Sequence, residues 1–406
     1  MIAALLTAAA LALSPQAGDV QLAAQHLRDD HPNLFRSLSP TAFDASVADL
    51  TARADTLNDD ELLVGLMRLA ALPGPRNGHT GIFPMDPGDR RPQHAYPTQL
   101  YTFSDGTYVV GQIGGRNLLR ARLVAINGHP LGDVLAAVRP LVPHDNDSTL
   151  ALLAPGYLNT PEVLHGLQLV PDLGPTRFTF ERAGRTFDAV LTPVTASRFA
   201  RGLDDIAHPL IPQAITGRVP AYIARRKTAL WATTLAAGRI YYLGYNAVTG
   251  DTFAASERLL RAAQSRKLRG VIVDLRLNGG GNNLTYRPLV NAIQRVGKTR
   301  RVVVLISRVT FSAAENFITE LELRTKPVFV GEPSGGSPNL YGDSRPTLLP
   351  ATGLVLHVAS IYWQLSSPGD DRLATEPRVR VPLSSASFFA GRDPVLAAAR
   401  SVVLGR

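Results

Sequence analysis

Val271-Ile272-Val273-Asp274-Leu275 and Val302-Val303-Val304-Leu305-Ile306 are the two runs that decide the fold class of this chain. Both are short and rich in β-branched residues, as buried strands are, and a helical pattern follows each of them. Alternation of strands and helices implies right-handed crossovers and a parallel sheet. The turns that follow the two runs are therefore expected at one edge of the sheet, because parallel strands bring their carboxyl ends together.

These two turns carry the groups that acyl transfer needs. The first turn is Asn278-Gly279-Gly280-Gly281, and the second contains Ser312 in Thr310–Glu315. Bare backbone N–H groups beside a hydroxyl are typical of an oxyanion hole beside a nucleophile. Two plainer interpretations stay open, since Ser312 can be a helix N-cap and the glycines can form a tight turn. The glycines lack the spacing of a dinucleotide site and the lysine of a P-loop.

A serine nucleophile needs a base, and the candidate is His79 in the loop Arg76–Gly81. Catalytic groups are often positioned on loops, although a lone histidine is commonly structural or exposed. The other histidines form no His-x-His or His-Glu-x-x-His pattern, so no metal site is predicted. The chain has no cysteine, which excludes disulfides and a cysteine nucleophile. No cofactor is expected.

Composition bounds the class of protein. The chain has 406 residues, which suggests two or three domains, and its hydrophobic content of 45% with 18% charged residues indicates a globular protein. The net charge is +9 and comes mainly from arginine, because only four residues are lysine: Lys227, Lys267, Lys298 and Lys326. The arginines are scattered along the sequence, which favours a solvated basic surface over nucleic-acid binding.

The chain divides into four parts. Residues 1–17 are apolar, too short to span a bilayer comfortably, and typical of a signal-peptide core, which predicts an exported protein (periplasmic, envelope-associated or extracellular). A buried N-terminal helix or a mis-assigned start are the alternatives. Residues 18–94 are predicted to be helical and to end in the His79 loop. Period-two runs predict a small, mostly β module at 95–194, and the strand–helix alternation falls within 195–406.

Three runs of the sequence, Val271–Asn283, Thr310–Phe317 and Gly331–Gly336, resemble the C-terminal-processing (tail-specific) protease family. That family also contains the tricorn protease core and the retinol-binding repeats of the eye. The resemblance covers roughly residues 20–400. It implies an α/β fold with a crotonase/ClpP-like catalytic domain of αββ type, an N-terminal helical segment and an inserted PDZ-like β module at 95–194.

The resemblance also implies roles for single residues. Ser312 is the expected nucleophile, and the N–H groups of Gly279, Gly280 and Ala313 are the expected oxyanion hole. Among the three glycines, Gly281 is expected to tolerate alanine best, because its backbone joins the following helical turn.

The base is expected to be His79 rather than lysine. The lysine of the processing proteases falls at Ser337 in this chain, and Lys326 precedes the wrong strand. The tricorn-like branch uses a histidine from the segment before the PDZ-like module, where this chain has His79. The Gly-rich segment after the nucleophile, with Gly335, Gly336 and Ser337, is expected to contact substrate.

An acid that orients His79 should lie late in the chain. The candidates are Asp370, Asp371 and Glu376, each of which can equally be a solvated loop carboxylate. A carboxylate bonded to the imidazole would fix its tautomer and stabilise the imidazolium.

The sequence thus predicts a serine endopeptidase that cleaves peptides or unfolded protein tails through an acyl-enzyme, without metal, cofactor or nucleic acid. The PDZ-like module would bind peptide ends by strand addition, or be a β insert without peptide affinity. A non-catalytic ligand- or peptide-binding protein on the same scaffold is the first alternative. A crotonase-type acyl-CoA enzyme is the second.

Overall fold

A computed structural model describes residues 13–203 and 208–406 of the chain. The predicted signal core at 1–17 lies mostly outside these residues. The first helix, α1 (Pro15–Asp30), already buries Ala17, so the folded chain begins slightly before the predicted boundary. Within the two described ranges, no helix combines the length and the apolarity that crossing a bilayer requires.

Three helices open the chain, as predicted: α1, α2 (Pro40–Arg53) and α3 (Asp59–Ala71). Ser39 caps α2 by accepting a hydrogen bond from the Ala42 N–H. Asn58 and Glu61 form a capping box at the start of α3, which satisfies two otherwise unpaired backbone N–H groups. These local signals explain why the helix starts could be placed from sequence.

The segment 95–194 contains an antiparallel sheet. Its strands are β2 (Thr98–Phe103), β3 (Gly106–Gln112), β4 (Arg122–Ile126), β6 (Thr176–Arg182) and β7 (Arg185–Leu191), in the order β2-β3-β4-β6-β7, and β5 (His129–Pro130) pairs with β4. Two short strands, β1 (His94–Ala95) and β8 (Val194–Thr195), pair with each other. The chain therefore enters and leaves this segment at one place.

The connection between β5 and β6 is helical, with α4 (Leu131–Val138), the 3-10 turn η1 (Arg139–Leu141), α5 (Asp147–Leu158) and α6 (Pro161–Gly166). The sequence predicts a short helix over Asp133–Val138, which α4 confirms, but the prediction of a mostly β segment was wrong for the rest of the connection. Helix α5 carries apolar residues around most of its circumference and contains Pro155, so it shows no helical stripe in the sequence. Because α5 packs against β2, it forms a wall beside the edge of the sheet.

The C-terminal part is built on a six-stranded sheet in the order β16-β13-β12-β11-β10-β9. The strands are β9 (Leu230–Leu235), β10 (Ile240–Tyr245), β11 (Gly270–Asp274), β12 (Arg301–Ile306), β13 (Val328–Gly331) and β16 (Val379–Arg380). Strands β10, β11, β12, β13 and β16 run parallel, and β9 pairs antiparallel with β10. The predicted strand–helix alternation is confirmed.

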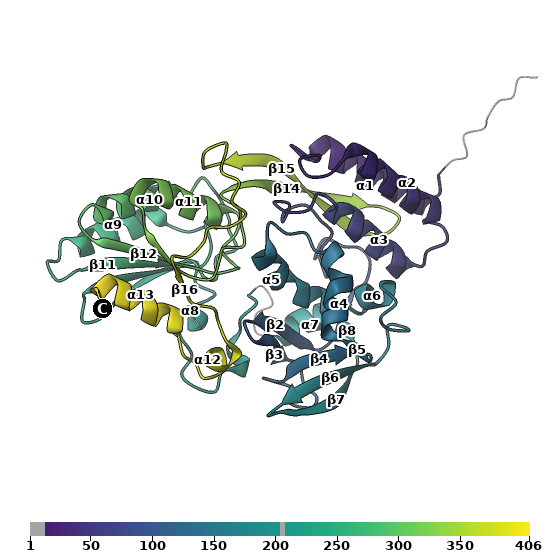
Figure 1. The fold of residues 1–406 in the computed structure, drawn as a ribbon, viewed down its shortest axis with the longest axis horizontal. Helices are drawn as coiled ribbons and strands as arrows, with labels where there is room; N and C mark the ends of the chain where they lie inside the picture. Colours follow the sequence, from purple (N-terminus) through teal and green to yellow (C-terminus); the bar gives the residue numbers. More distant parts are fainter. Residues whose placement is uncertain (1–12, 204–207) are drawn as a thin grey trace, which may run out of the picture.

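Helices cover both faces of this sheet (Figure 1). Helices α9 (Thr252–Ala263), α10 (Arg287–Gly297) and α11 (Ala313–Thr325) lie on one face, and α13 (Pro394–Leu404) lies on the other. Alternate residues of a strand serve the two faces: Val271 and Val273 pack with the first group, and Ile272 packs with α13. The short helices α7 (Ala196–Gly202), η2 (Pro212–Ala214), α8 (Ala221–Ala224) and α12 (Ser385–Phe389) complete the chain.

A long hairpin extends from the C-terminal part of the molecule to the N-terminal helices. Its strands are β14 (Asn339–Leu349) and β15 (Leu354–Gln364). The hairpin packs against α1 (Figure 1), and an isolated bridge joins Gly81 to His357. The sequence predicted β strands here, but it did not predict that the hairpin extends as far as α1. The hairpin links the His79 loop to the C-terminal part through the pairing of Gly81 with His357.

Candidate active site

Ser312 lies in a strained backbone conformation at the start of α11. Its φ of 55° and ψ of −127° fall in a region that non-glycine residues rarely adopt. Although Ser312 occupies the N-cap position, its side chain makes no capping hydrogen bond. The capping interpretation therefore has no support, and the hydroxyl is free for another partner. Strain of this kind is typical of residues whose side chains must be held in a functional position.

That partner is the ring of His79. The Nε2 atom of His79 lies 2.9 Å from the Oγ of Ser312, although the two residues are 233 positions apart. The ring of Phe311 stacks on the imidazole, with centroids 4.4 Å apart and planes inclined by 20°. A base at this distance can accept the hydroxyl proton directly. The pair that the sequence proposed is thus in contact.

The His79 loop is anchored on both sides of the histidine. The Gly78 N–H donates to Oδ1 of the buried Asp145 at 2.8 Å. Two backbone hydrogen bonds of 2.9 Å join Gly81 to His357 on the long hairpin. Neither Asp145 nor His357 was recognised from the sequence, because both act through backbone groups far away along the chain.

Burial lowers the pKa of His79 to about 4, while the Asp343 carboxylate and the Tyr341 carbonyl act in the opposite direction. The imidazole is therefore neutral at pH 7, as a base must be. Its Nδ1 atom is buried and makes no hydrogen bond of good geometry with the described part of the chain. Asp343 itself has a φ of 53° and accepts a hydrogen bond from Trp363 Nε1. No local pattern in the sequence marked Asp343, which lies in the middle of β14.

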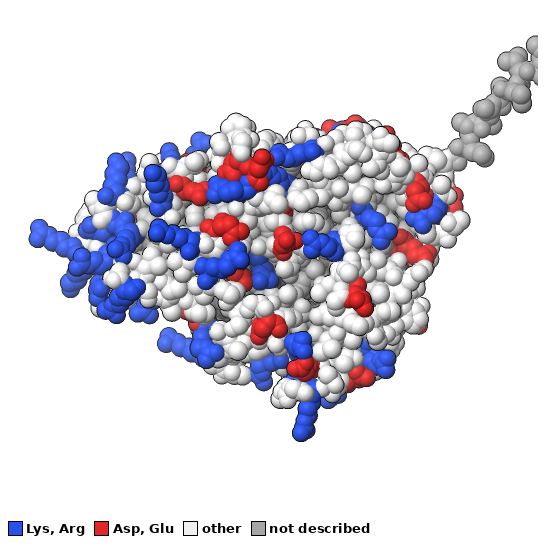
Figure 2. Space-filling model, viewed as in Figure 1, with Lys and Arg blue, Asp and Glu red and all other residues white. Residues whose placement is uncertain are grey.

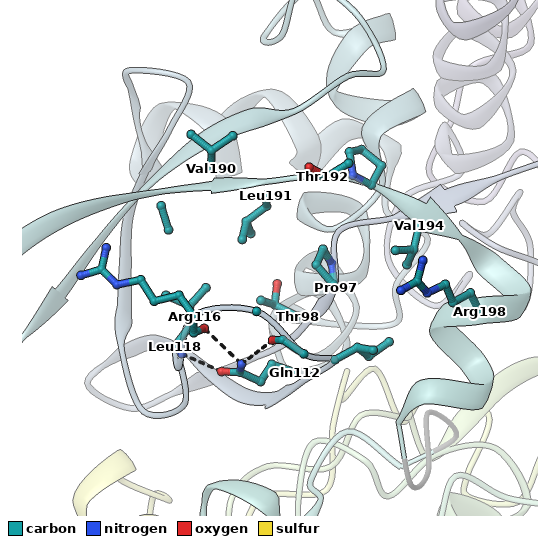
Figure 3. A pocket seen from close by; sticks show the side chains of 15 residues that line it. Pro97, Thr98, Gln112, Arg116, Leu118, Val190, Leu191, Thr192, Val194 and Arg198 are labelled. Atoms are coloured by element: carbon teal, nitrogen blue, oxygen red, sulfur yellow. Dashed lines mark hydrogen bonds between the residues drawn. The ribbon is translucent and has the colours of Figure 1, made fainter.

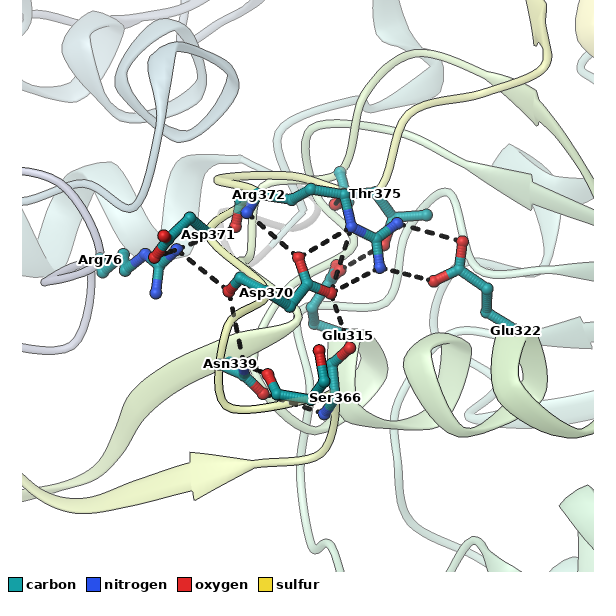
Figure 4. Close-up of polar contacts among 11 residues, drawn as sticks. Arg76, Glu315, Glu322, Asn339, Ser366, Asp370, Asp371, Arg372 and Thr375 are labelled. Carbon is teal, nitrogen blue, oxygen red and sulfur yellow. Dashed lines mark hydrogen bonds and ion pairs between the residues drawn. The ribbon is translucent and has the colours of Figure 1, made fainter.

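The three predicted orienting acids are not hydrogen-bonded to His79. Asp370 pairs with Arg372 at 2.7 Å and accepts from Ser366, as Figure 4 shows. Asp371 is largely exposed and faces two arginines, at 2.9 and 3.4 Å. Glu376 is paired with Arg380 at the surface. Each carboxylate has an arginine partner of its own, and the hairpin rather than this loop faces the imidazole.

The oxyanion turn differs from the prediction in one donor. The Gly280 N–H already donates to Oδ1 of Asn278 at 3.0 Å, so it is not available to a substrate oxygen in this conformation. The N–H groups of Gly279 and Ala313 have no hydrogen-bond partner among the described residues. Gly280 matters for its missing side chain instead: its φ is 117°, and a Cβ there would lie 2.7 Å from the Cβ of Ser312.

The expectation for Gly281 was wrong. This residue does not join the helix, because α10 begins only at Arg287. Its φ is 142°, and an added Cβ would lie 2.5 Å from the Val248 carbonyl oxygen. Gly279, by contrast, has open space around the position of a Cβ. The order of tolerance to alanine is thus reversed, with Gly279 the most permissive.

The segment that was expected to contact substrate is buried. The N–H groups of Gly335 and Gly336 donate to the Thr310 carbonyl at 2.9 and 3.2 Å. Ser337 donates its N–H to Oδ2 of Asp145 and its hydroxyl to a backbone carbonyl. These hydrogen bonds fix the loop that carries Ser312. Lys326 caps the far end of α11, so it cannot serve as the base.

Two buried carboxyl groups lie under the site. Burial raises the pKa of Asp145 to about 6, against the opposing effect of its two backbone hydrogen bonds. Burial also raises the pKa of Glu315, in the first turn of α11, to about 8. Thr375 donates to one Glu315 oxygen at 2.7 Å, and the other oxygen has no partner among the described residues. Asp145 is the more informative of the two, because it joins the His79 loop to the Ser337 segment.

A pocket of about 610 Å³ opens beside the pair, lined by His79, Gly279 and Phe311 together with strand β2 and helix α5. Its walls are mostly apolar and include Leu100, Leu152 and Val309. The Arg308 side chain also lines the pocket, but Glu332 neutralises it at 3.0 Å. The volume and lining are typical of a site for an apolar ligand group.

A second pocket, of about 320 Å³, lies within the 95–194 segment, where the ends of β3 and β7 approach each other (Figure 3). Gln112 lies at its floor, and its side chain bonds to the loop that follows β3. None of the predicted site residues lines this pocket. We therefore place the candidate active site at the larger pocket.

No protein-family model and no curated protein matches the sequence. Among solved structures, a mutant of CPAF superposes with a TM-score of 0.67 at 13% identity, over 96% of this chain and 97% of that one. Mature CPAF complexed with lactacystin gives 0.62 at 14% identity, over 96% and 98%. The photosystem II D1 C-terminal processing protease aligns over 94% of this chain and 99% of that one at 13% identity, with a TM-score of only 0.42. The chain therefore has the fold of CPAF over almost its whole length.

Proposed function

We propose that this protein is a serine peptidase in which Ser312 is the nucleophile and His79 is the general base. The observation that carries the proposal is the 2.9 Å contact between His79 Nε2 and Ser312 Oγ. Two loops 233 positions apart in the sequence meet there, and the serine is held in a strained conformation without a capping role. A purely structural serine would not need this arrangement.

The reaction follows from the geometry. His79 accepts the Ser312 proton as Oγ attacks the substrate carbonyl, and the negative charge moves to the carbonyl oxygen. The N–H groups of Gly279 and Ala313 and the N-terminus of α11 stabilise that charge. The imidazolium then donates its proton to the leaving amine, which yields the acyl-enzyme. In the second half of the reaction, His79 accepts a proton from a water molecule as it attacks the ester. The imidazolium then returns the proton to Ser312 Oγ as the acid leaves.

The surroundings of the pocket support an extended peptide as the substrate. Val109 of β3 is hydrogen-bonded to the segment that follows this strand. Its N–H donates to the Ala121 carbonyl at 3.0 Å, and its carbonyl accepts from the Arg120 N–H at 2.8 Å. Its partner across the ladder is Leu100, so the backbone groups of Leu100 point away from β3. Strand β2 is the edge of its sheet and lines the pocket. A substrate strand can therefore pair with β2 and continue to Ser312.

We assign residues 95–194 as a PDZ-like module and residues 195–406 as a crotonase/ClpP-like catalytic unit. The antiparallel sheet of this segment, in which β2 is an edge strand, supports the first assignment. The parallel sheet with both candidate turns at its carboxyl edge supports the second. Export remains a prediction from residues 1–17 alone.

A peptide-binding protein without catalysis is the second candidate, because no carboxylate of the described residues is hydrogen-bonded to Nδ1 of His79. A fluorophosphonate probe separates the two, because it labels only a serine whose hydroxyl is activated. We expect labelling of the wild type and none of Ser312→Ala. Ser344→Ala, which changes another serine at the pocket, is the control and should label normally. An unlabelled wild type that still binds peptide would establish the binding protein instead.

A further inference from the structure

The edge of the six-stranded sheet opposite the active site gathers positive charge. The amino ends of the parallel strands and the helix ends that lead into them carry nine cations: Arg239, Arg266, Lys267, Arg269, Arg295, Lys298, Arg300, Arg301 and Lys326. We call this set the basic edge. Figure 2 shows Lys and Arg gathered at the corresponding end of the molecule. The sequence suggested scattered arginines, but the fold brings these together.

Backbone pairing places two of these residues side by side, since the Arg269 N–H donates to the Arg239 carbonyl at 2.8 Å. Adjacent strands are about 4.8 Å apart, so these two side chains start about 5 Å from each other. Arg301 stands opposite Gly270 on the next strand and directs its side chain to the other face of the sheet, where its Nη1 donates to the Val402 carbonyl at 2.6 Å. Lys326 precedes the next strand of the same sheet. Like charges this close repel unless an anion lies between them.

The protein itself supplies no such anion. Among the described residues, none of the nine forms an ion pair, and seven are exposed, Arg239 and Arg300 being half-buried. The segments that carry them, 236–240, 264–270, 295–301 and 325–328, contain no Asp or Glu. The chain has 42 Lys and Arg against 33 Asp and Glu. The net charge of +9 is thus equal to the number of cations in the basic edge.

Helix dipoles account for only a small part of this charge. The carboxyl ends of α9, α10 and α11 lie at the basic edge, and cations are stabilised there. Each helix end is equivalent to about −0.5 of a charge, so three ends balance about 1.5 of the nine. Moreover, Arg239 and Arg269 adjoin strands rather than helix ends, and only Arg301 serves a further helix end, since its Nη1 donates to the Val402 carbonyl in the last turn of α13 at 2.6 Å. Most of the charge has no structural use within the protein.

We propose that the basic edge binds the phosphate groups of an anionic lipid surface. Six of its nine residues are arginines, whose planar guanidinium groups bind phosphate through two hydrogen bonds. Clusters of four to eight such cations are typical of proteins that bind acidic lipid headgroups. The array extends along four strands and onto the helix side of the sheet, so it is two-dimensional, as a lipid surface is.

Nucleic acid fits this array less well. The bases of a single strand stack on aromatic side chains when a protein binds it. The four segments of the basic edge present no exposed aromatic side chain among the described residues. A duplex needs a helix or strand that enters a groove, whereas this edge presents tight turns. Binding to lipid through this edge would leave the pocket beside Ser312 free, because the pocket opens at the carboxyl ends of the same strands.

The test measures sedimentation with vesicles, using the full chain with Ser312→Ala so that hydrolysis plays no part. We expect binding to vesicles of phosphatidylcholine with 30% phosphatidylglycerol (roughly the content of acidic membranes) and none to pure phosphatidylcholine. Arg266→Gln, Lys267→Gln and Arg269→Gln together should lower the partition coefficient about 100-fold. The matched control is Arg90→Gln, Arg185→Gln and Arg378→Gln, three exposed arginines elsewhere that remove the same charge. The control should bind within about threefold of the parent.

Two results would overturn the proposal. Equal losses in both triple variants would mean that net charge alone, rather than this edge, drives binding. Tighter binding to a 20-bp DNA duplex than to the anionic vesicles, at equal phosphate concentration, would assign the edge to nucleic acid. Both outcomes are independent of the proposed peptidase activity, because the binding is measured without the nucleophile.

Discussion

The two edges of the six-stranded sheet are built from the same strands but differ in how their polar groups are paired. At the carboxyl edge, Ser312 and Gly280 adopt φ values of 55° and 117°, and polar groups are paired one by one. At the amino edge, nine cations have no ion-pair partner in the described chain. The parallel arrangement explains the difference, because α9, α10 and α11 all direct their amino ends to one edge and their carboxyl ends to the other.

The lengths of the connections differ in the same direction. From β11 to α10 the chain passes through residues 275–286, and from β12 to α11 through 307–312. The return connection from α9 to β11 is 264–269, as long as 307–312, but those from α10 to β12 and from α11 to β13 are only 298–300 and 326–327. Long turns at the carboxyl edge can hold strained, specific geometry, as in other open α/β sheets. Short turns at the amino edge only close the fold, so their side chains are free to serve a surface.

The largest effect at the carboxyl edge is expected from His79→Ala. Without the base, Ser312 keeps its proton, and kcat/KM on a fluorogenic peptide should fall at least about a thousandfold. The ring also packs on Phe311, so thermal unfolding must be measured to show that the fold persists. A variant that keeps its rate would mean that another group accepts the proton.

Gly280→Ala should lower kcat by about 10² to 10³, because its Cβ would displace Ser312 from His79 and from the oxyanion donors. Gly279→Ala is the matched control, since open space surrounds its Cβ position. Measured on one peptide, the two variants should differ at least tenfold. Equal kcat values would show that the turn does not fix the position of the nucleophile.

The pH–rate profile tests the electrostatics of the same edge. Because burial lowers the pKa of His79 to about 4, the base stays neutral as the pH falls below 6.5. We expect kcat/KM to hold until about pH 5 and to fall as His79 is protonated below it. An apparent pKa of 6.5 or above would mean that a carboxylate approaches Nδ1 when substrate is bound.

Asp145 titrates in a neighbouring window, since its pKa is raised to about 6. The profile should therefore be repeated with Asp145→Asn, which leaves His79 to titrate at low pH, because the pKa of Glu315 is raised to about 8.

Asp145→Asn should also lower kcat about tenfold, because an amide cannot accept from both the Gly78 and the Ser337 N–H. The free energy of unfolding should fall by about 1–3 kcal/mol. Asp147→Asn is the control: its side chain is 86% exposed, and its stability should change by less than about 0.5 kcal/mol. If loss of stability occurs without loss of kcat, Asp145 holds the fold but not the base.

The smallest effect is expected at the amino edge, from Lys326→Gly. Lys326 ends α11 with φ 49° and ψ 58°, a conformation that glycine adopts at lower cost. The free energy of unfolding should rise by about 0.5–1 kcal/mol, without a change in hydrolysis. Lys298→Gly removes the same charge at a residue with φ −63°, so it should not be stabilising. A change of kcat in either variant would show that the two edges are coupled.

Much of the fold could be predicted because its signals are local. The strands at 271–275 and 302–306 and the caps at Ser39 and Asn58 depend on residues within a few positions of each other. Helix α5 was missed for the same reason, since its burial on several sides removes the local periodicity. The contact between His79 and Ser312 was also predictable, as Ser312, His79 and the glycine turn are unusual within their own segments.

The sequence by itself determined the order of strands and helices and the identity of the two loops that meet. Only the tertiary structure decided what surrounds them: Asp343 rather than Asp370, Asp371 or Glu376 acts on His79, and the Gly280 N–H is already engaged. The basic edge belongs to the same class. Contacts across a hairpin or between neighbouring strands join residues that are far apart in sequence, and their distances depend on register and packing, which no single segment encodes.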